Sequence, residues 1–235
     1  MHILTTTSAS LDDLIEPVDL QQQPADVVAL SFTDSDLAGI AAAWRGDPTL
    51  PSLRLAALRD LRHPMSVDLW VDSVARHAKV ILVRLLGGYD WWRYGCDQLA
   101  AVAGAHCVKL ALLPGEDRAD DPRLTEASTL PRKELDALLA FFREGGPDNM
   151  RGLAEKLAGL ARGETIETDA RPVPKAGFYS FRTAQQLISP LEGEMPGRAE
   201  GGHSILAIPI LFYRSMLLAS DAAPIDALCE ALAAR

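Results

Sequence analysis

The sequence predicts an α/β protein: a parallel, doubly wound sheet of the flavodoxin or Rossmann type, then a helical hairpin and the incomplete start of a second α/β unit. Short apolar runs alternate with helical patterns up to Gly115, an arrangement typical of strand-helix-strand units. The run over residues 80–86, VILVRLL, has the length and the branched side chains of a central strand buried on both faces. A chain of 235 residues with 48% hydrophobic residues can also bury a substantial core.

Strands and helices are expected to alternate along the first part of the chain. The strands are expected over residues 3–6, 26–32, 53–61, 80–86 and 108–113. Asp34 or Ser35 is expected to cap a helix over residues 36–44, and Ser66 the following helix. Leu69, Trp70, Val74 and His77 should form the core-facing stripe of that second helix. Right-handed crossovers then leave few topologies other than a doubly wound sheet.

Arginines interrupt the apolar pattern of the third expected strand, at Arg54, Arg59 and Arg62. Charged side chains are rarely buried, so this strand is expected either to lie near an edge of the sheet or to present cations to a ligand. Solvated arginines at an edge are the simpler interpretation.

The hydrophobic period becomes helical after residue 122. Two sets of apolar residues recur at helical intervals and are separated by Gly145-Gly146-Pro147: Leu135, Leu138, Leu139 and Phe142, then Met150, Leu153, Leu157 and Leu160. We therefore expect an α/β domain over 1–118, a helical hairpin over 119–170, a linker over 171–204 and a truncated second α/β unit over 205–235. This last unit should contain a strand over 205–213 and a helix over 224–234. Within the linker, the Gly-, Pro- and Glu-rich stretch over 189–202 is expected to be a disordered insertion.

Composition excludes several classes of function. A net charge of −9 argues against nucleic acid as a partner, because phosphate binding requires a basic face. No apolar run approaches the length of a membrane span and the amino terminus resembles no signal peptide, so a cytoplasmic protein is expected. No P-loop, GxGxxG, HExxH or GxSxG motif is present. The adjacent His106 and Cys107 lack further ligands nearby in the sequence, so we predict neither metal ligands nor catalytic residues in this chain.

A diglycine followed by aromatic residues ends the expected central strand. Gly87 and Gly88 stand at its carboxyl end, where open α/β sheets bind ligands. The aromatic residues that follow are Tyr89, Trp91, Trp92 and Tyr94. Helical spacing places these rings on different sides, so one ring is expected to face a groove. The alternative is that all of them only pack the helix onto the sheet.

Residues 83–99, VRLLGGYDWWRYGCDQL, resemble the RLLGG-x-x-YW-x-YG-x-x-x-L signature of the CobN-type large subunit of aerobic cobaltochelatase, and more loosely its magnesium chelatase relative. Residues 208–215, IPILFYRS, and 223–228, APIDAL, are similar to a second block of the same family. The two matches occur in the family's order. The resemblance covers nearly the whole chain apart from the stretch over 189–202, and it corresponds to the amino-terminal portion of that subunit only.

The resemblance implies a role in cobalamin biosynthesis, in the ATP-dependent insertion of Co²⁺ into hydrogenobyrinic acid a,c-diamide. In that family ATP is hydrolysed by separate motor subunits, which would be partners of this chain, while the large subunit holds the corrinoid substrate and the cobalt. The family is a ligase forming nitrogen–metal bonds, but this portion is expected to lack the metal-inserting centre and to be inactive alone. The alternative is a non-catalytic, flavodoxin-like binding or scaffold module.

The resemblance also suggests which residues bind the substrate. They are Arg84, Gly87, Gly88, Trp92, Tyr94 and Arg214. In this hypothesis Trp92 or Tyr94 lies against the face of the ring, and Arg84 or Arg214 lies near its acidic side chains. In the competing interpretation these aromatic residues serve packing alone.

Overall fold

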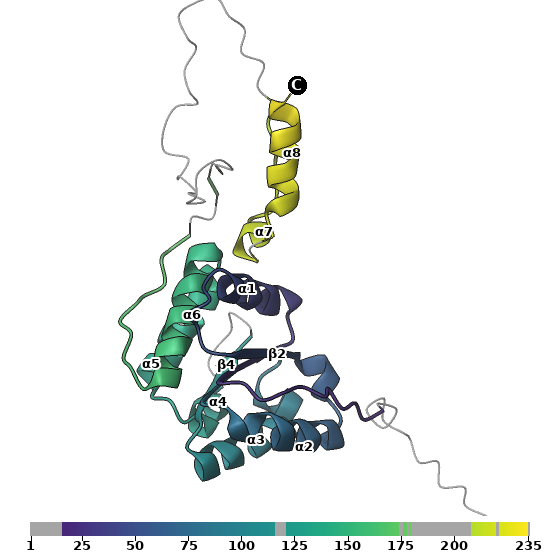
Figure 1. Cartoon of the computed structure of the whole chain (residues 1–235), viewed down its shortest axis with the longest axis vertical. Helices are drawn as coiled ribbons and strands as arrows, with labels where there is room; N and C mark the ends of the chain where they lie inside the picture. Colours follow the sequence, from purple (N-terminus) through teal and green to yellow (C-terminus); the bar gives the residue numbers. More distant parts are fainter. Residues whose placement is uncertain are drawn as a thin grey trace, which may run out of the picture.

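The computed structural model describes residues 16–115, 121–173, 176–177, 179, 208–219 and 221–234 (Figure 1). Its centre is a sheet of four parallel strands in the order β2-β1-β3-β4. The strands are β1 (Val27–Ser31), β2 (Leu53–Ala57), β3 (Val80–Leu85) and β4 (Lys109–Pro114). The strand expected over residues 3–6 lies outside the described residues.

The predicted central strand is confirmed. In the register of the sheet, Val27 of β1 lies opposite both Leu53 of β2 and Val80 of β3. Val80 also lies opposite Lys109 of β4. The chain passes outward from β1 to β2 and then returns across β1 to form β3, so the strand order reverses between β1 and β3. That reversal is the topological switch point of a doubly wound sheet.

Helices cover both faces of the sheet, as a doubly wound fold requires (Figure 1). One face carries α1 (Asp34–Arg45), α5 (Arg132–Glu144) and α6 (Pro147–Arg162), and the other carries α2 (Pro64–Ser73), α3 (Arg93–His106) and α4 (Pro122–Ala127). Successive strand residues point to opposite faces. Accordingly Val80 and Leu82 pack with the first set of helices, and Ile81 and Val83 with the second.

The predicted helical hairpin is present as α5 and α6. The turn between them contains Gly145 and Gly146 at φ +63° and +85°, backbone angles that favour glycine. Both helices contribute to the hydrophobic core on their face of the sheet, where Leu138 and Leu153 are fully buried. The hairpin therefore shares its core with the sheet. The domain boundaries proposed at residues 118 and 170 stay a prediction.

Several expected ends and caps are wrong. The third strand ends at Ala57 rather than at residue 61, and a 3-10 helix, η2 (Leu58–Leu61), follows it. The tighter turn lets Leu58 and Leu61 both enter the core, since residues three apart share a face of a 3-10 helix. The strand does lie at an edge of the sheet, as its arginines suggested.

The helix caps also differ from expectation. Thr33 is the N-cap of α1, so Asp34 and Ser35 lie inside the helix. His63 caps α2 by accepting a hydrogen bond from the Met65 amide, while Ser66 accepts one from the Val18 amide at 2.7 Å. Pro64 is favoured at the first helical position, because its missing N–H needs no partner there, and this moves the start of α2 upstream.

The expected core-facing stripe of α2 is only partly correct. Trp70 and Val74 are buried, whereas Leu69 is 43% exposed and His77 is exposed. The helix ends at Ser73, and His77 belongs to the short 3-10 helix η3 (Ala75–His77). The prediction assumed one continuous helix up to His77, and it is wrong beyond Ser73 because α2 ends there.

The carboxyl-terminal segment differs most from expectation. No strand occurs over residues 208–213, the described part of the stretch predicted as a strand over 205–213. A strand requires a pairing partner, and the described segment has none in the sheet. It leads instead into α7 (Arg214–Leu218), which was not predicted. The helix predicted over residues 224–234 is confirmed as α8 (Ala223–Ala233). Residues 189–202 lie outside the described residues.

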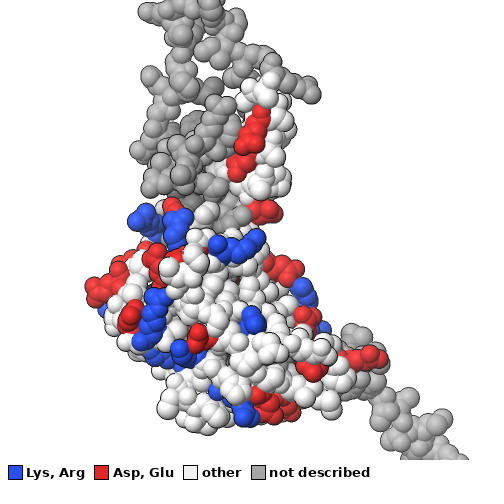
Figure 2. Space-filling view, in the orientation of Figure 1, with Lys and Arg blue, Asp and Glu red and all other residues white. Residues whose placement is uncertain are grey.

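No helix in the described residues is long and apolar enough to cross a membrane. On the face shown in Figure 2, acidic and basic side chains are interspersed rather than gathered into one basic surface.

Candidate functional site at the carboxyl edge of the sheet

The diglycine turn lies at the carboxyl end of β3, beside the switch point of the sheet. Gly87 and Gly88 have φ of +86° and +75°. A Cβ atom on Gly87 would come within 3.1 Å of Trp91, and one on Gly88 within 3.0 Å of Asp121. Glycine is favoured at both positions for two reasons: it adopts the positive φ that the turn requires, and it leaves room for neighbouring side chains to approach the main chain. The turn has the position expected of a ligand-facing loop.

Arg84 is engaged inside the protein. Its guanidinium lies 2.6 Å from the carboxylate of Asp36 and donates a hydrogen bond to the carbonyl of Gly115 at 3.2 Å. The guanidinium also lies 4.9 Å from the centre of the Phe142 ring, and Asp36 accepts a further hydrogen bond from Ser31. These contacts fasten α1 and β3 together. A role of Arg84 in binding substrate stays a prediction.

Trp92 is a packing residue. Only 4% of it is exposed, and its indole N–H donates to the carbonyl of Leu61 at 2.8 Å. The ring lies so close to Gly95 that a Cβ there would come within 2.1 Å of it. Because Trp92 lies within the core, this structure favours the packing interpretation of that ring over stacking on a ligand.

Tyr94 lies on α3 next to α2. It is 39% exposed, and its hydroxyl lies 2.6 Å from the carboxylate of Asp68 on α2. This hydrogen bond to an acidic group raises the pKa of the Tyr94 hydroxyl. The residue thus links two helices on one face of the sheet.

Trp91 is the more exposed of the two tryptophans. It is 45% exposed, and its ring centre lies 4.0 Å from that of Phe32 with the planes at 83°. The guanidinium of Arg62 lies 5.4 Å from the centre of the same ring. The expectation that one of these rings faces a groove stays a prediction. Trp91, the most exposed of the four rings, was not among the predicted substrate-binding residues.

A spacing argument could have separated the two tryptophans. Trp92 is followed at helical intervals by Cys96, Leu99 and Ala103, all of which are buried on the inner side of α3. Trp91 lies outside this stripe. The contacts with Phe32 and Arg62 had no comparable signal, because they join segments distant in the sequence.

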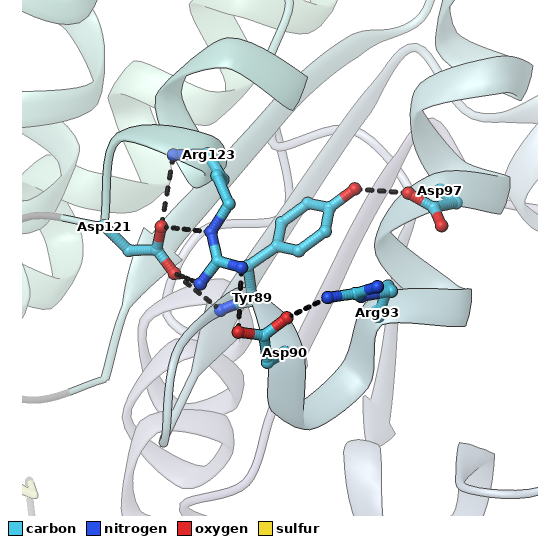
Figure 3. A network of polar contacts seen from close by, with 6 residues as sticks. All are labelled: Tyr89, Asp90, Arg93, Asp97, Asp121 and Arg123. Atoms are coloured by element: carbon cyan, nitrogen blue, oxygen red, sulfur yellow. Dashed lines mark hydrogen bonds and ion pairs between the residues drawn. The ribbon is translucent and has the colours of Figure 1, made fainter.

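A network of polar contacts joins the diglycine turn to α4 (Figure 3). Its members are Tyr89, Asp90, Arg93, Asp97, Asp121 and Arg123. The Arg123 guanidinium lies 3.0 Å from Asp121 and 2.8 Å from Asp90. It lowers the pKa of the Asp121 carboxyl, and Arg93 together with Arg123 lowers that of Asp90. Asp121 also accepts hydrogen bonds from the amides of Tyr89 and Arg123. A hydrogen bond to Asp97 raises the pKa of Tyr89 to about 12, so this phenol stays protonated at neutral pH.

Arg214 belongs to a different part of the chain. It is the first residue of α7 and donates a hydrogen bond to the carbonyl of Val173 at 2.8 Å. The main chain of α7 also contacts the α5–α6 turn, where the Gly146 amide donates to the carbonyl of Leu218. Arg214 thus helps to attach the carboxyl-terminal segment. Its assignment to substrate binding stays a prediction.

A small cavity lies next to the amino-terminal end of β4, away from the diglycine turn. It has a volume of about 200 Å³, and its polar lining consists of Lys109, Glu134, Lys156, Glu164 and Thr165. Lys156 is almost fully buried, 3.0 Å from Glu134 and 3.2 Å from the carbonyl of Ile166. Lys109 donates to the carbonyl of Leu160. The lysines therefore serve mainly to hold α5, α6 and β4 together.

His106 is the last residue of α3, and Cys107 caps its carboxyl end. Cys107 has φ +57°, a left-handed conformation that terminates the helix. Among the described residues, no group of three or more His, Cys, Asp or Glu side chains is placed to hold a metal ion.

Two known proteins are similar to this chain along its whole length. The chain is 39% identical over 237 residues to the aerobic cobaltochelatase subunit CobN of Sinorhizobium sp and 36% identical over 239 residues to that of Pseudomonas aeruginosa. Each alignment covers 100% of this chain but only 18% of the relative, so the chain spans about a fifth of the length of these relatives. No protein-family model matches.

The fold is similar to that of a solved structure, the catalytic subunit of cobaltochelatase from Mycobacterium tuberculosis. The TM-score is 0.61 at 26% sequence identity, and the match covers 87% of this chain and 15% of that subunit. Sequence and fold therefore agree. Along its whole length the chain is a homologue of an amino-terminal portion of the CobN subunit of aerobic cobaltochelatase.

Proposed function

We propose that this chain serves in the cytoplasm as the amino-terminal α/β portion of the tetrapyrrole-holding subunit of cobaltochelatase. The reaction is the ATP-dependent insertion of Co²⁺ into hydrogenobyrinic acid a,c-diamide during cobalamin biosynthesis. The observation that supports this most is the 39% identity to a CobN subunit along the whole chain. ATP would be hydrolysed by separate motor subunits, and the corrinoid would be shared with the remainder of the large subunit.

We further propose that these 235 residues have no chelatase activity alone. They correspond to 18% of the length of the curated relatives, so most of what those subunits contain has no counterpart here. The function of this portion would be to contact the substrate or to position the rest of the subunit.

A second candidate is a non-catalytic, flavodoxin-like binding or scaffold module. The placement of Arg84 and Trp92 favours it, because the first is paired with Asp36 and the second is buried. Two of the residues proposed to bind the ring thus already have structural partners. In this alternative the chain docks to other subunits without touching the substrate.

A domain-exchange experiment tests the proposed function. The matching portion of the Pseudomonas aeruginosa relative is replaced by this chain, and cobalt insertion is measured with ATP, motor subunits and hydrogenobyrinic acid a,c-diamide. The control carries an unrelated α/β domain of similar size at the same place. We expect the chimera to retain activity that the control lacks, and the isolated chain to show none.

Two results would contradict the proposal. A folded and assembled chimera that is no more active than the control would show that this chain does not supply the family function. Cobalt insertion by the isolated chain would show that it is not merely a portion of the catalyst. An active chimera whose substrate KM is unchanged by substitutions at the carboxyl edge would favour the scaffold alternative.

A further inference from the structure

We propose that Trp91 and Arg62, at the switch point of the sheet, form the surface on which this chain contacts a flat conjugated macrocycle bearing carboxylates. This inference rests on the proposed function, which supplies the class of ligand. It replaces Trp92 by its neighbour as the contacting ring. The surface comprises Phe32, Arg62, Leu86, Gly87 and Trp91, and is called the Trp91 surface below.

Topology brings this surface together. Phe32 follows β1 directly, Leu86 and Gly87 follow β3, and Arg62 follows η2 after β2. Because the strands are parallel, their carboxyl ends all meet at one edge of the sheet. Phe32 and Leu86 flank the gap between β1 and β3, where the strand order reverses. Open α/β sheets bind their ligands at this position.

The Trp91 surface exposes large apolar side chains to solvent. Trp91 is 45% exposed, and Leu86, the residue that follows β3, is 47% exposed, whereas the apolar residues of β3 itself are buried. Two large apolar side chains left exposed at the carboxyl ends of the strands favour a site of contact here. Gly87 brings the ring against the main chain, because a side chain there would come within 3.1 Å of Trp91.

The other tryptophans are not available for such a contact. Trp70 and Trp92 are 2% and 4% exposed, and the half-buried Trp44 donates its indole N–H to the carbonyl of Pro51. All four tryptophans lie within the described residues, and Trp91 is the one among them with a large exposed area. An indole offers a large planar surface suited to a conjugated ring.

Positive charge accompanies the apolar surface. The guanidinium of Arg62 lies 5.4 Å from the centre of the Trp91 ring. Arg59, one turn earlier in η2, pairs at 2.7 Å with Asp34, and both of these side chains are more than half exposed. An exposed ion pair is weak, so a carboxylate of the ligand can compete for Arg59. In a chain of net charge −9, an arginine over the exposed indole and a second arginine one turn earlier in the chain favour an anionic, planar ligand over a neutral one.

Binding of a cobalt-free corrin with free carboxylates tests the inference. Visible absorption of the corrin is titrated with the full 235-residue chain and with the chimera described above, since this readout does not depend on which tryptophan is present. We expect Trp91→Ala to weaken binding about tenfold and Arg62→Met several-fold. The fully esterified corrin should bind more weakly, and Arg62→Met should not weaken it further.

Met65→Ala is the matched control. Met65 is 53% exposed on α2, so its substitution removes an exposed apolar side chain outside the Trp91 surface. It should leave corrin affinity unchanged. Trp91→Phe keeps an aromatic ring and should restore most of the affinity lost in Trp91→Ala, which a general loss of folding would not allow.

Three outcomes would overturn the inference. The first is corrin binding by Trp91→Ala within about twofold of the unsubstituted protein, a difference too small for a lost ring contact. The second is the absence of binding in both unsubstituted proteins. The third is a loss of assembly with the motor subunits on Trp91→Ala at unchanged corrin affinity, which would identify a protein-docking surface. An inactive chimera would contradict the proposed function itself, whereas an active chimera insensitive to Trp91→Ala would contradict only this inference.

Discussion

Asp121 accepts a hydrogen bond from the main-chain amide of Tyr89 at 3.0 Å and so ties the turn after β3 to the start of α4. The same carboxylate caps α4 through the Arg123 amide and pairs with the Arg123 guanidinium. One side chain thus fixes two loops at the carboxyl edge of the sheet (Figure 3).

We expect Asp121→Ala to lower the free energy of unfolding by about 1 to 2 kcal/mol, the usual cost of losing an N-cap together with a further hydrogen bond. Urea denaturation at pH 7 measures this difference in the free energy of unfolding. The pKa of Asp121 is lowered by Arg123, so its contribution is complete above the unfolded value near 3.8 and is lost as the pH falls through the lower folded value. The stability difference between the two proteins should therefore shrink on acidification. Asp148→Ala, in an exposed pair with Arg151, is the control and should change stability little.

Truncation of the two adjacent tryptophans should lower stability by very different amounts. Trp92→Ala removes a buried ring and its hydrogen bond to Leu61, so we expect a loss of about 3 to 5 kcal/mol. Trp91→Ala removes an exposed ring and should cost less than about 1 kcal/mol. Both are measured by chemical denaturation followed by far-ultraviolet circular dichroism. Equal losses at the two positions would refute the assignment of Trp92 to the core and Trp91 to the surface.

The pair between Arg84 and Asp36 should be strongly coupled. Their side chains are 16% and 10% exposed, so removing either partner leaves a charge largely out of water. We expect Arg84→Met or Asp36→Asn to cost about 3 kcal/mol each, and the double variant to cost clearly less than the sum. Arg76→Met breaks an exposed pair with Asp72 and should cost less than about 0.5 kcal/mol. Additive losses in the double-mutant cycle would show that the pair does not act as a unit.

Sequence patterns predicted the elements that depend on local periodicity. The apolar run ending in Arg84-Leu85-Leu86 identified the central strand, and leucines at helical intervals identified α5 and α6. The patterns gave wrong predictions where contacts between residues distant in the sequence determine the structure. The segment over residues 208–213 has the composition of a strand, but no described strand pairs with it. At the site, the position of Gly87 and Gly88 was predicted, whereas the exposure of Trp91 depends on how η4 (Tyr89–Trp92) turns the chain before α3.

The cysteines should differ sharply in reactivity. Burial raises the pKa of the Cys96 thiol to about 12, and Asp97 and Asp121 add to this rise. At pH 8 only about one molecule in ten thousand would carry the reactive thiolate, and Cys96 is also inaccessible. Iodoacetamide should therefore label the exposed Cys107 and spare Cys96, as peptide mass spectrometry would show. All three cysteines should react in denaturant. Labelling of native Cys96 as fast as Cys107 would contradict its placement in the core.

Helix α8 should be the least stable of the longer helices. Its 11 residues include none that is buried, and Leu228 is 45% exposed. A helix of this length holds poorly in water without packing, because nucleation is costly. Helix α6, by contrast, buries residues such as Met150, Leu153 and Leu157 on successive turns. Hydrogen exchange followed by mass spectrometry should show the amides of α8 exchanging orders of magnitude faster than those of α6.

A hydrogen bond from the Tyr179 hydroxyl to Asp226, at 2.8 Å, contributes to holding α8. Tyr179→Phe should therefore speed exchange in α8 further while leaving α6 unchanged. Leu228→Asp should leave the denaturation midpoint of the sheet and its helices unaltered, because that side chain is exposed. Protection of α8 equal to that of α6 would mean that another surface covers it. If that protection rises with protein concentration, the covering surface is a second copy of the chain, and the exposed face of α8 would then be an interface rather than a free helix.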